Sequence, residues 1–241
     1  MKPLSSALIM LVFACSTVCA QVDDIKQKSS EHSSGSNEQS SSSGSNSGFY
    51  LDVFIQSVDM IAAWQSSALQ TKESNPTVIS FDVMLQAAIQ PSSYYIVNPR
   101  MRANWGIFST DFRLNYLIEE DFDGTKFIRT DDWQIIQLNV VTTRNVTFRI
   151  GGGTLHENFS GGKTFPEYTA GLHLFANHEK FGGITEYRWS EPRLEWSGLV
   201  HYRLFDTGHM HTFVTGGVAF QQYYRSVNVW GIQGGLMFRF Y

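Results

Sequence analysis

Cysteine, charge and long apolar runs are all scarce in this 241-residue chain. Its two cysteines, Cys15 and Cys19, both precede residue 21, which argues against a disulfide scaffold or a Cys-ligated metal site. Charged residues make up 17% of the chain and the formal net charge is −4. Because nucleic-acid binding requires a basic surface, we expect no nucleic-acid partner. No apolar run reaches the roughly 20 residues of a membrane-spanning helix, so the sequence predicts no helical anchor.

The N-terminus has the pattern of a secretory signal. Lys2 is followed by the apolar run Ala7 to Ala14 and by the small residue Ala20. Residues 1–20 are therefore predicted to be a signal peptide that is cleaved after Ala20. Lipoprotein processing at Cys15 is an alternative, because the residues before it loosely resemble a lipobox and a serine-rich tether follows.

Residues 21–48 have low sequence complexity. Eleven serines lie between Ser29 and Gly48, and glycines separate them. Such a segment has little apolar surface to offset the entropy lost on ordering. The sequence therefore predicts a disordered Ser/Gly-rich linker over residues 21–48.

The remaining residues, 49–241, are predicted to form one β-barrel domain because apolar and polar residues alternate along them. In 78–90 the odd-numbered residues from Ile79 to Ile89 are apolar, whereas Asp82 and Gln86 lie on the other face. Strict alternation is the pattern of a β-strand. The same pattern recurs in eight further ranges: 108–119, 134–143, 146–154, 168–177, 183–189, 193–204, 210–221 and 227–240.

The first segment of this domain fits two structures. Phe49, Leu51, Val53 and Ile55 alternate as in a strand, but Leu51, Ile55 and Val58 also fit an amphipathic helix. Bacterial single-chain barrels have an even number of strands. We therefore predict that a strand starts at Phe49 and brings the count to ten. If this segment is a helix instead, and one of the weaker ranges is not a strand, the barrel would have eight strands.

Aromatic and polar residues decide the class of barrel. The apolar faces are rich in aromatic residues, which also gather near strand ends, and lysine is scarce on the polar faces. An apolar outer band with aromatic borders and a polar interior is typical of membrane barrels. The sequence thus predicts an all-β fold, a closed antiparallel up-and-down transmembrane β-barrel of about 8–10 strands. Short turns near residues 144, 180 and 207 are expected at one end, and longer loops over 120–131 and 156–167 at the other. A soluble lipocalin-like barrel or a sandwich is the alternative.

The last strand resembles the terminal strand of bacterial outer-membrane β-barrel proteins. Its outward set is Leu236, Phe238 and Phe240, Arg239 lies between two aromatic residues, and Tyr241 ends the chain. The chain departs from the family pattern in having Tyr241 after the expected terminal Phe240. The resemblance implies residence in the bacterial outer membrane, contact with outer-membrane lipid, and insertion by the barrel-assembly machinery.

The polar faces carry five carboxylates and five guanidinium groups. Because unpaired buried charge is costly, this balance predicts a network of paired charges that fills a narrow lumen. The predicted network consists of Asp82, Asp111, Glu119, Glu186, Glu195, Arg113, Arg149, Arg188, Arg203 and Arg239.

Little in the sequence indicates catalysis. We assign no catalytic residues, metal or cofactor, since the pair His209 and His211 is weak evidence for a metal site. The leading hypothesis is an integral outer-membrane barrel with a structural, surface-interaction or narrow transport role. A lipid-modifying barrel enzyme that uses His156 or His173 is one alternative. A soluble exported lipid-binding barrel is the other.

Overall fold

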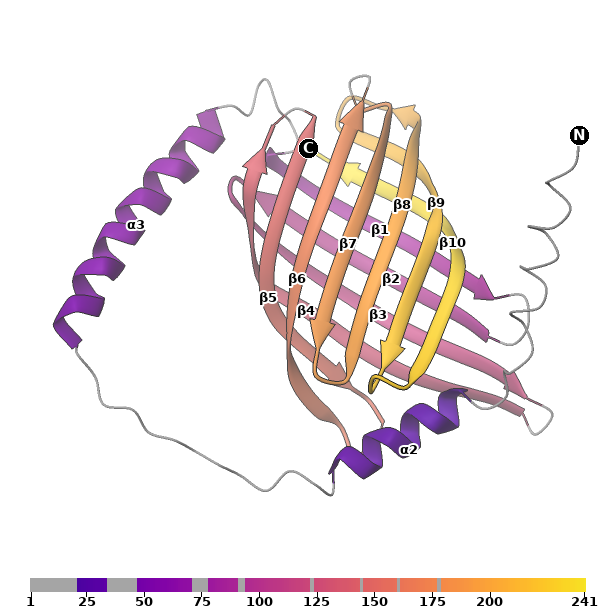
Figure 1. Cartoon of the computed structure of the whole chain (residues 1–241). Helices are drawn as coiled ribbons and strands as arrows, with labels where there is room; N and C mark the ends of the chain where they lie inside the picture. The colour runs from indigo at the N-terminus through magenta and orange to yellow at the C-terminus, as the bar shows by residue number, and fades with distance from the viewer. Residues whose placement is uncertain are drawn as a thin grey trace, which may run out of the picture.

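The fold is a closed barrel of ten antiparallel strands with two helices (Figure 1). The computed structural model describes residues 21–33, 47–70, 78–90, 94–121, 124–143, 145–159, 161–176 and 179–241. The helices are α2 (Gln21–Ser33) and α3 (Ser47–Gln70). The strands are β1 (Ile79–Gln90), β2 (Tyr94–Trp105), β3 (Phe108–Asp121), β4 (Gly124–Thr142), β5 (Val146–Glu157), β6 (Lys163–Ala176), β7 (Phe181–Ser190), β8 (Arg193–Asp206), β9 (Met210–Tyr223) and β10 (Val227–Phe240).

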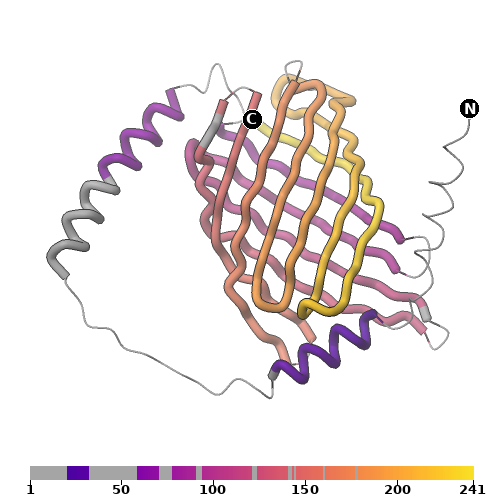
Figure 2. Tube along the Cα trace, viewed as in Figure 1, coloured from indigo at the N-terminus to yellow at the C-terminus, as the bar shows by residue number. Residues whose placement is uncertain are grey.

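Each strand pairs with its neighbours in the sequence, and β1 pairs with β10 to close the sheet. In that closing pair Asp82 lies opposite Arg239 and Leu85 opposite Leu236. The tube in Figure 2 shows the chain passing back and forth around the wall without a crossover. The all-β closed antiparallel barrel is thus confirmed, and each of the nine alternating ranges overlaps one of its strands.

The predicted number of ten strands is right, but one member is wrong. The segment that begins at Phe49 lies in helix α3, so the helical interpretation of its apolar spacing is the correct one. The strand missing from the prediction is β2. It contains Pro99. Proline has no backbone N–H to donate to the hydrogen-bond ladder of a sheet, so it argues against a strand when only the sequence is considered. The structure accommodates Pro99 on the outer face, opposite Leu85.

Alternation along the strands separates two faces of the wall. In β1 the side chains of Asp82, Met84 and Gln86 are buried inside, whereas Leu85 and Ile89 are 53% and 55% exposed. The same division holds in β2, where Arg100 and Arg102 are buried and Met101 is exposed. The apolar face of the barrel is therefore its outer face, which is the reverse of a soluble barrel.

The barrel has two open ends, which we name by what lies there. The α2 mouth is the end with the connections at 91–93, 122–123, 158–162, 191–192 and 224–226. The terminal mouth has the connections at 106–107, 143–145, 177–180 and 207–209, together with Tyr241. The expected long loops at the α2 mouth are wrong, because β3, β4, β5 and β6 continue through most of those residues and leave only 122–123 and 158–162 as connections.

Helix α2 lies across the α2 mouth (Figure 1). Its residues Val22, Ile25 and Ser29 are fully buried and share one helical face. They pack on an apolar floor that includes Ile96, Leu117, Ile128, Tyr223 and Val229. The prediction of disorder is therefore wrong for residues 21–33, because two apolar side chains suffice when a barrel mouth covers them.

Helix α3 makes its described contacts at the terminal mouth. The Gln65 side chain donates to the Trp105 carbonyl (3.0 Å) and accepts from the Ile107 N–H (2.7 Å). Neither described helix is long and apolar enough to cross a membrane. The predicted signal peptide, the lipidation alternative at Cys15 and residues 34–46 of the predicted linker lie outside the described residues.

Candidate functional site

The most distinctive site in the barrel is a network of buried charged side chains across its lumen. It joins five arginines to five carboxylates by contacts of ion-pair length. The alternation of the strands places all ten on inward positions. The members are Arg100, Arg102, Arg113, Arg188, Arg193, Asp111, Asp132, Glu167, Glu186 and Glu195.

One half of the network surrounds Asp111 on β3. This carboxylate accepts from Arg102 (2.9 Å) on β2 and from Arg188 (2.8 Å) on β7, and Arg100 forks onto it as well. Glu186 on β7 receives Arg100 (2.6 Å) from β2, across the lumen, and also Arg188 (2.6 Å) from its own strand. These ion pairs therefore connect β2 and β3 with β7 on the opposite side of the barrel.

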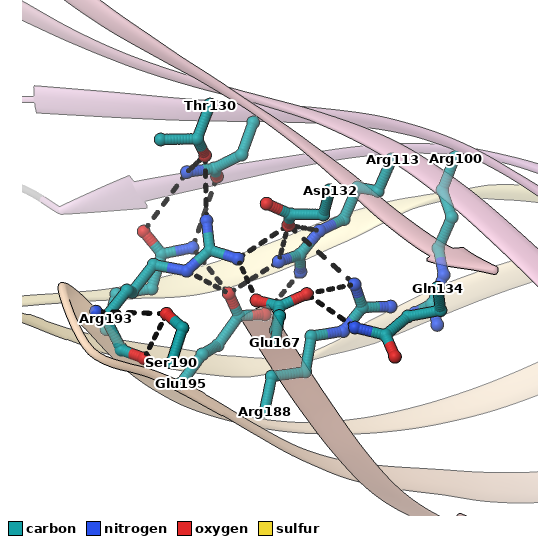
Figure 3. A network of polar contacts seen from close by, with 12 residues as sticks. Arg100, Arg113, Thr130, Asp132, Gln134, Glu167, Arg188, Ser190, Arg193 and Glu195 are labelled. Atoms are coloured by element: carbon teal, nitrogen blue, oxygen red, sulfur yellow. Dashed lines mark hydrogen bonds and ion pairs between the residues drawn. The ribbon is translucent and has the colours of Figure 1, made fainter. Parts of the chain in front are cut away.

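The other half lies closer to the α2 mouth and is drawn in Figure 3. Arg193 reaches Asp132 (2.6 Å) on β4 and Glu167 (2.8 Å) on β6. Arg113 donates to Glu195 (2.7 Å) and to Asp132 (2.9 Å). Arg188 lies 3.7 Å from Asp132 and so links the two halves. Each carboxylate of the network faces more than one guanidinium, so its charge is compensated inside the barrel.

A separate polar group lines the lumen toward the terminal mouth. Arg239 forks onto Asp82 with contacts of 2.7 and 3.0 Å, across the strands that close the barrel. His173 and His201 face each other at 2.9 Å between their Nε2 atoms. Beyond them, Tyr241 donates to Glu179 (2.6 Å), and burial raises the pKa of this phenol above its ordinary value.

At the α2 mouth the helix is held by charged residues of the rim. Glu119 accepts from the backbone N–H groups of Gln21 (3.2 Å) and Val22 (3.0 Å), so it caps the helix N-terminus. Ser29 donates to Glu157 (3.1 Å), and Asp23 pairs with Lys126 (2.6 Å).

Tyr224, in the turn after β9, holds Glu157 from the other side. Its hydroxyl donates to both oxygens of that carboxylate at 2.8 Å. Burial, and the carboxylate beside it, raise the pKa of the Tyr224 phenol above its ordinary value. The phenol therefore stays a donor at neutral pH.

The structure distributes the ten predicted charged residues over several places. Asp111, Arg113, Glu186, Arg188 and Glu195 lie in the central network, and Asp82 and Arg239 form their own pair. Glu119 caps α2 at the α2 mouth. Arg149 is buried in the lumen, but no ion pair of the described residues includes it. Arg203 is at the terminal rim, where it pairs with the exposed Asp206 (3.2 Å).

Five members of the network were not predicted. Arg100 and Arg102 belong to β2, the strand that was missed. Glu167 lies in the predicted loop 156–167, Asp132 falls between the predicted loop 120–131 and the predicted strand 134–143, and Arg193 is the first residue of the predicted strand 193–204, where it was not assigned to the network. The alternation itself could have identified these three residues. Each lies two positions before an inward residue of the same strand, so it is expected to face the lumen as well. Of the predicted C-terminal set, Leu236, Phe238 and Phe240 point outward and Tyr241 lies at the terminal mouth.

Comparison with known proteins adds no relative, because no family model, no curated protein and no solved structure matches this chain. Among the described residues there is no group of three or more His, Cys, Asp or Glu side chains placed to hold a metal ion. The site must therefore be interpreted from its own geometry.

Proposed function

We propose that this protein is an integral outer-membrane β-barrel that spans the bilayer with a filled, non-conducting lumen and serves a structural or surface role. The observation that carries the proposal is the outer wall. Leu85, Ile232 and Val200 are more than half exposed there, and in the middle of the wall no described outward position is charged. Exposure of so much apolar surface is costly in water but favourable in hydrocarbon.

Aromatic residues border this band on both sides. Toward the α2 mouth, Tyr187, Trp196, Phe220 and Trp230 lie opposite one another in register across four adjacent strands. Toward the terminal mouth, Phe81 lies opposite Phe240, and Phe181 opposite Tyr202. Two such girdles match the headgroup levels of a membrane.

The filled lumen supports a structural role over transport. Among the described residues, ion pairs between strands that are far apart around the wall place charges of both signs across the lumen, whereas a selective pore requires an excess of one sign. No observation favours the lipid-modifying alternative. The His156 ring contacts Thr164 (2.9 Å), and His173 is buried inside the lumen, away from the lipid-facing wall.

The proposal is tested by folding the purified protein into phospholipid vesicles. We expect a folded form that resists protease, migrates faster than the heated form on a denaturing gel, and gives no discrete conductance steps in a planar bilayer. β-Sheet circular dichroism of a monomer in buffer without detergent would contradict membrane insertion. Regular conductance steps would contradict the filled lumen but not the insertion.

A further inference from the structure

A surface groove cuts into the outer wall beside the α2 mouth. It has a volume of about 720 Å³ and is lined by residues of β6, β7, β8 and β9 and of the β7–β8 and β9–β10 turns. Its wall includes Tyr187 and Trp189 of β7 and Leu194 of β8, which are all outward positions. The groove therefore opens onto the surface that we propose to face lipid.

Apolar and aromatic side chains make up the floor of this groove. The Trp189 ring stacks on Tyr168 (5.8 Å between centroids) and contacts the Tyr187 ring at 5.5 Å. Ala170 lines one side of the groove, where its single methyl group occupies little space. An aromatic channel of this kind fits a linear hydrocarbon chain, which gains dispersion contacts along its length.

The end of the groove at the α2 mouth carries a cation, Arg225. Arg225, in the β9–β10 turn, lines the groove and also a second cavity of about 480 Å³ between that turn and α2. Glu191 lines both cavities as well and contacts His32 (2.6 Å), while Lys28 pairs with Glu31 (2.9 Å). None of the hydrogen bonds and ion pairs of the described residues uses the Arg225 side chain.

We propose that the groove is a binding site for a membrane phospholipid, with one acyl chain along Tyr187 and Trp189 and the lipid phosphate on Arg225. This inference rests on the proposed membrane function. The planar guanidinium is suited to phosphate oxygens, and Arg225 lies in a turn of the α2 mouth, beyond the girdle residues Phe220 and Trp230 of the two strands that this turn joins. A lipid thus placed has its headgroup at the mouth and its chain toward the bilayer centre.

The test measures retained lipid by native mass spectrometry of the protein in nonionic detergent. The probes are phosphatidylglycerol, a diacylglycerol with the same chains, and inorganic phosphate alone. We expect phosphatidylglycerol to be retained about tenfold more than diacylglycerol, as one charge-assisted contact provides. Inorganic phosphate alone should not be retained. Equal retention of the two lipids, or retention of free phosphate, would overturn the proposal.

Two variants separate the headgroup contact from the chain contact. Arg225→Gln should abolish the preference for phosphatidylglycerol and leave diacylglycerol unchanged, whereas Ala170→Trp should fill the groove and lower retention of both lipids. The matched controls are Lys180→Gln, an exposed cation at the terminal mouth, and Ala103→Trp, an outward alanine on β2. Both controls should retain phosphatidylglycerol as the wild type does.

The two proposals fail in different ways. If Arg225→Gln and Ala170→Trp bind like the wild type while the barrel still inserts into vesicles, only the lipid site is wrong. If the protein does not insert into vesicles at all, the membrane function is wrong, whatever the binding measurement gives.

Discussion

Glu119, close to the end of β3, caps a helix that lies 97 residues earlier in the chain. Its carboxylate accepts from the Val22 N–H at 3.0 Å, while the Val22 side chain is fully buried in the barrel mouth. Glu119 therefore holds the N-terminal end of α2 at the barrel mouth, in addition to the contacts that Asp23 and Ser29 make. The sequence could not show this, because a glutamate on an inward position is equally suited to an ion pair in the lumen.

Glu119→Gln tests the cap. The neutral side chain keeps one acceptor but loses the charge that favours a helix N-terminus, so we expect α2 to be held less tightly by about 1 kcal/mol. Protease cleavage within residues 21–33 of the protein folded in detergent micelles should become several-fold faster. The control is Glu120→Gln, because Glu120 is exposed and adjacent. Equal cleavage rates in both variants would show that Glu119 does not hold the helix.

Removal of Asp111 should destabilise the barrel strongly. Asp111→Asn leaves Arg100, Arg102 and Arg188 around a neutral side chain, and breaking a buried pair costs about 3–5 kcal/mol. Urea unfolding in lipid vesicles measures this loss. The double variant Asp111→Asn with Arg102→Met removes one of the excess charges and should recover part of the stability. A single variant within about 0.5 kcal/mol of the wild type would contradict this view of the network.

Two adjacent glycines in β9 offer an internal control for strand packing. A Cβ on Gly217 would lie 2.0 Å from the Gly198 carbonyl oxygen, whereas one on Gly216 would meet nothing within 4 Å. Gly217→Ala should therefore disrupt the β8–β9 pairing and lower folding yield in vesicles. Gly216→Ala should be neutral or slightly stabilising, by about 0.5 kcal/mol. Similar yields for the two variants would contradict so close an approach of the two strands at Gly217.

Stability should fall in alkaline solution through Tyr224. Its phenol has a folded pKa above its ordinary value, so its contribution is complete below about pH 10 and is lost as the pH rises toward the folded pKa. Urea unfolding at about pH 9 and about pH 11 should show a larger loss for the wild type than for Tyr224→Phe. Tyr95→Phe, on the exposed outer wall, should behave as the wild type does. An equal loss in Tyr224→Phe would assign the alkaline effect to other groups.

Periodicity predicted the barrel well because each strand has one face in the lumen and one outside, and nine strands show this in the sequence. It failed at β2, where Pro99 interrupts the pattern, and at α3, where Leu51 and Ile55 satisfy both periods. The site was predicted in part, because inward charges were found only on strands already recognised. Arg100 and Arg102 were missed along with β2. Which carboxylate meets which arginine depends on the closure of the barrel and cannot be inferred from spacing.

The contacts of the two helices lie at opposite mouths, and this has a consequence for membrane insertion. α2 binds at the α2 mouth through Asp23 and Lys126, whereas Gln65 of α3 and the start of β1 lie at the terminal mouth. In a bilayer the two mouths would face opposite sides. The two contacts could then be kept together only if the chain crossed the bilayer between α2 and α3, and unpaired backbone groups in hydrocarbon are costly. We therefore expect α2 to dissociate from the α2 mouth when the barrel inserts with its terminal mouth outside the vesicle.

A zero-length carbodiimide tests this expectation on the native residues, since it joins a carboxylate to an amine in direct contact. The Asp23 carboxylate and the Lys126 ammonium are 2.6 Å apart. In detergent micelles the Asp23–Lys126 amide should form and be detected by mass spectrometry of the digested protein, and Lys126→Gln should abolish it. After insertion into vesicles the same crosslink should be largely lost. Full crosslinking in vesicles would instead mean that residues 21–33 cross the bilayer together with the turns of the α2 mouth.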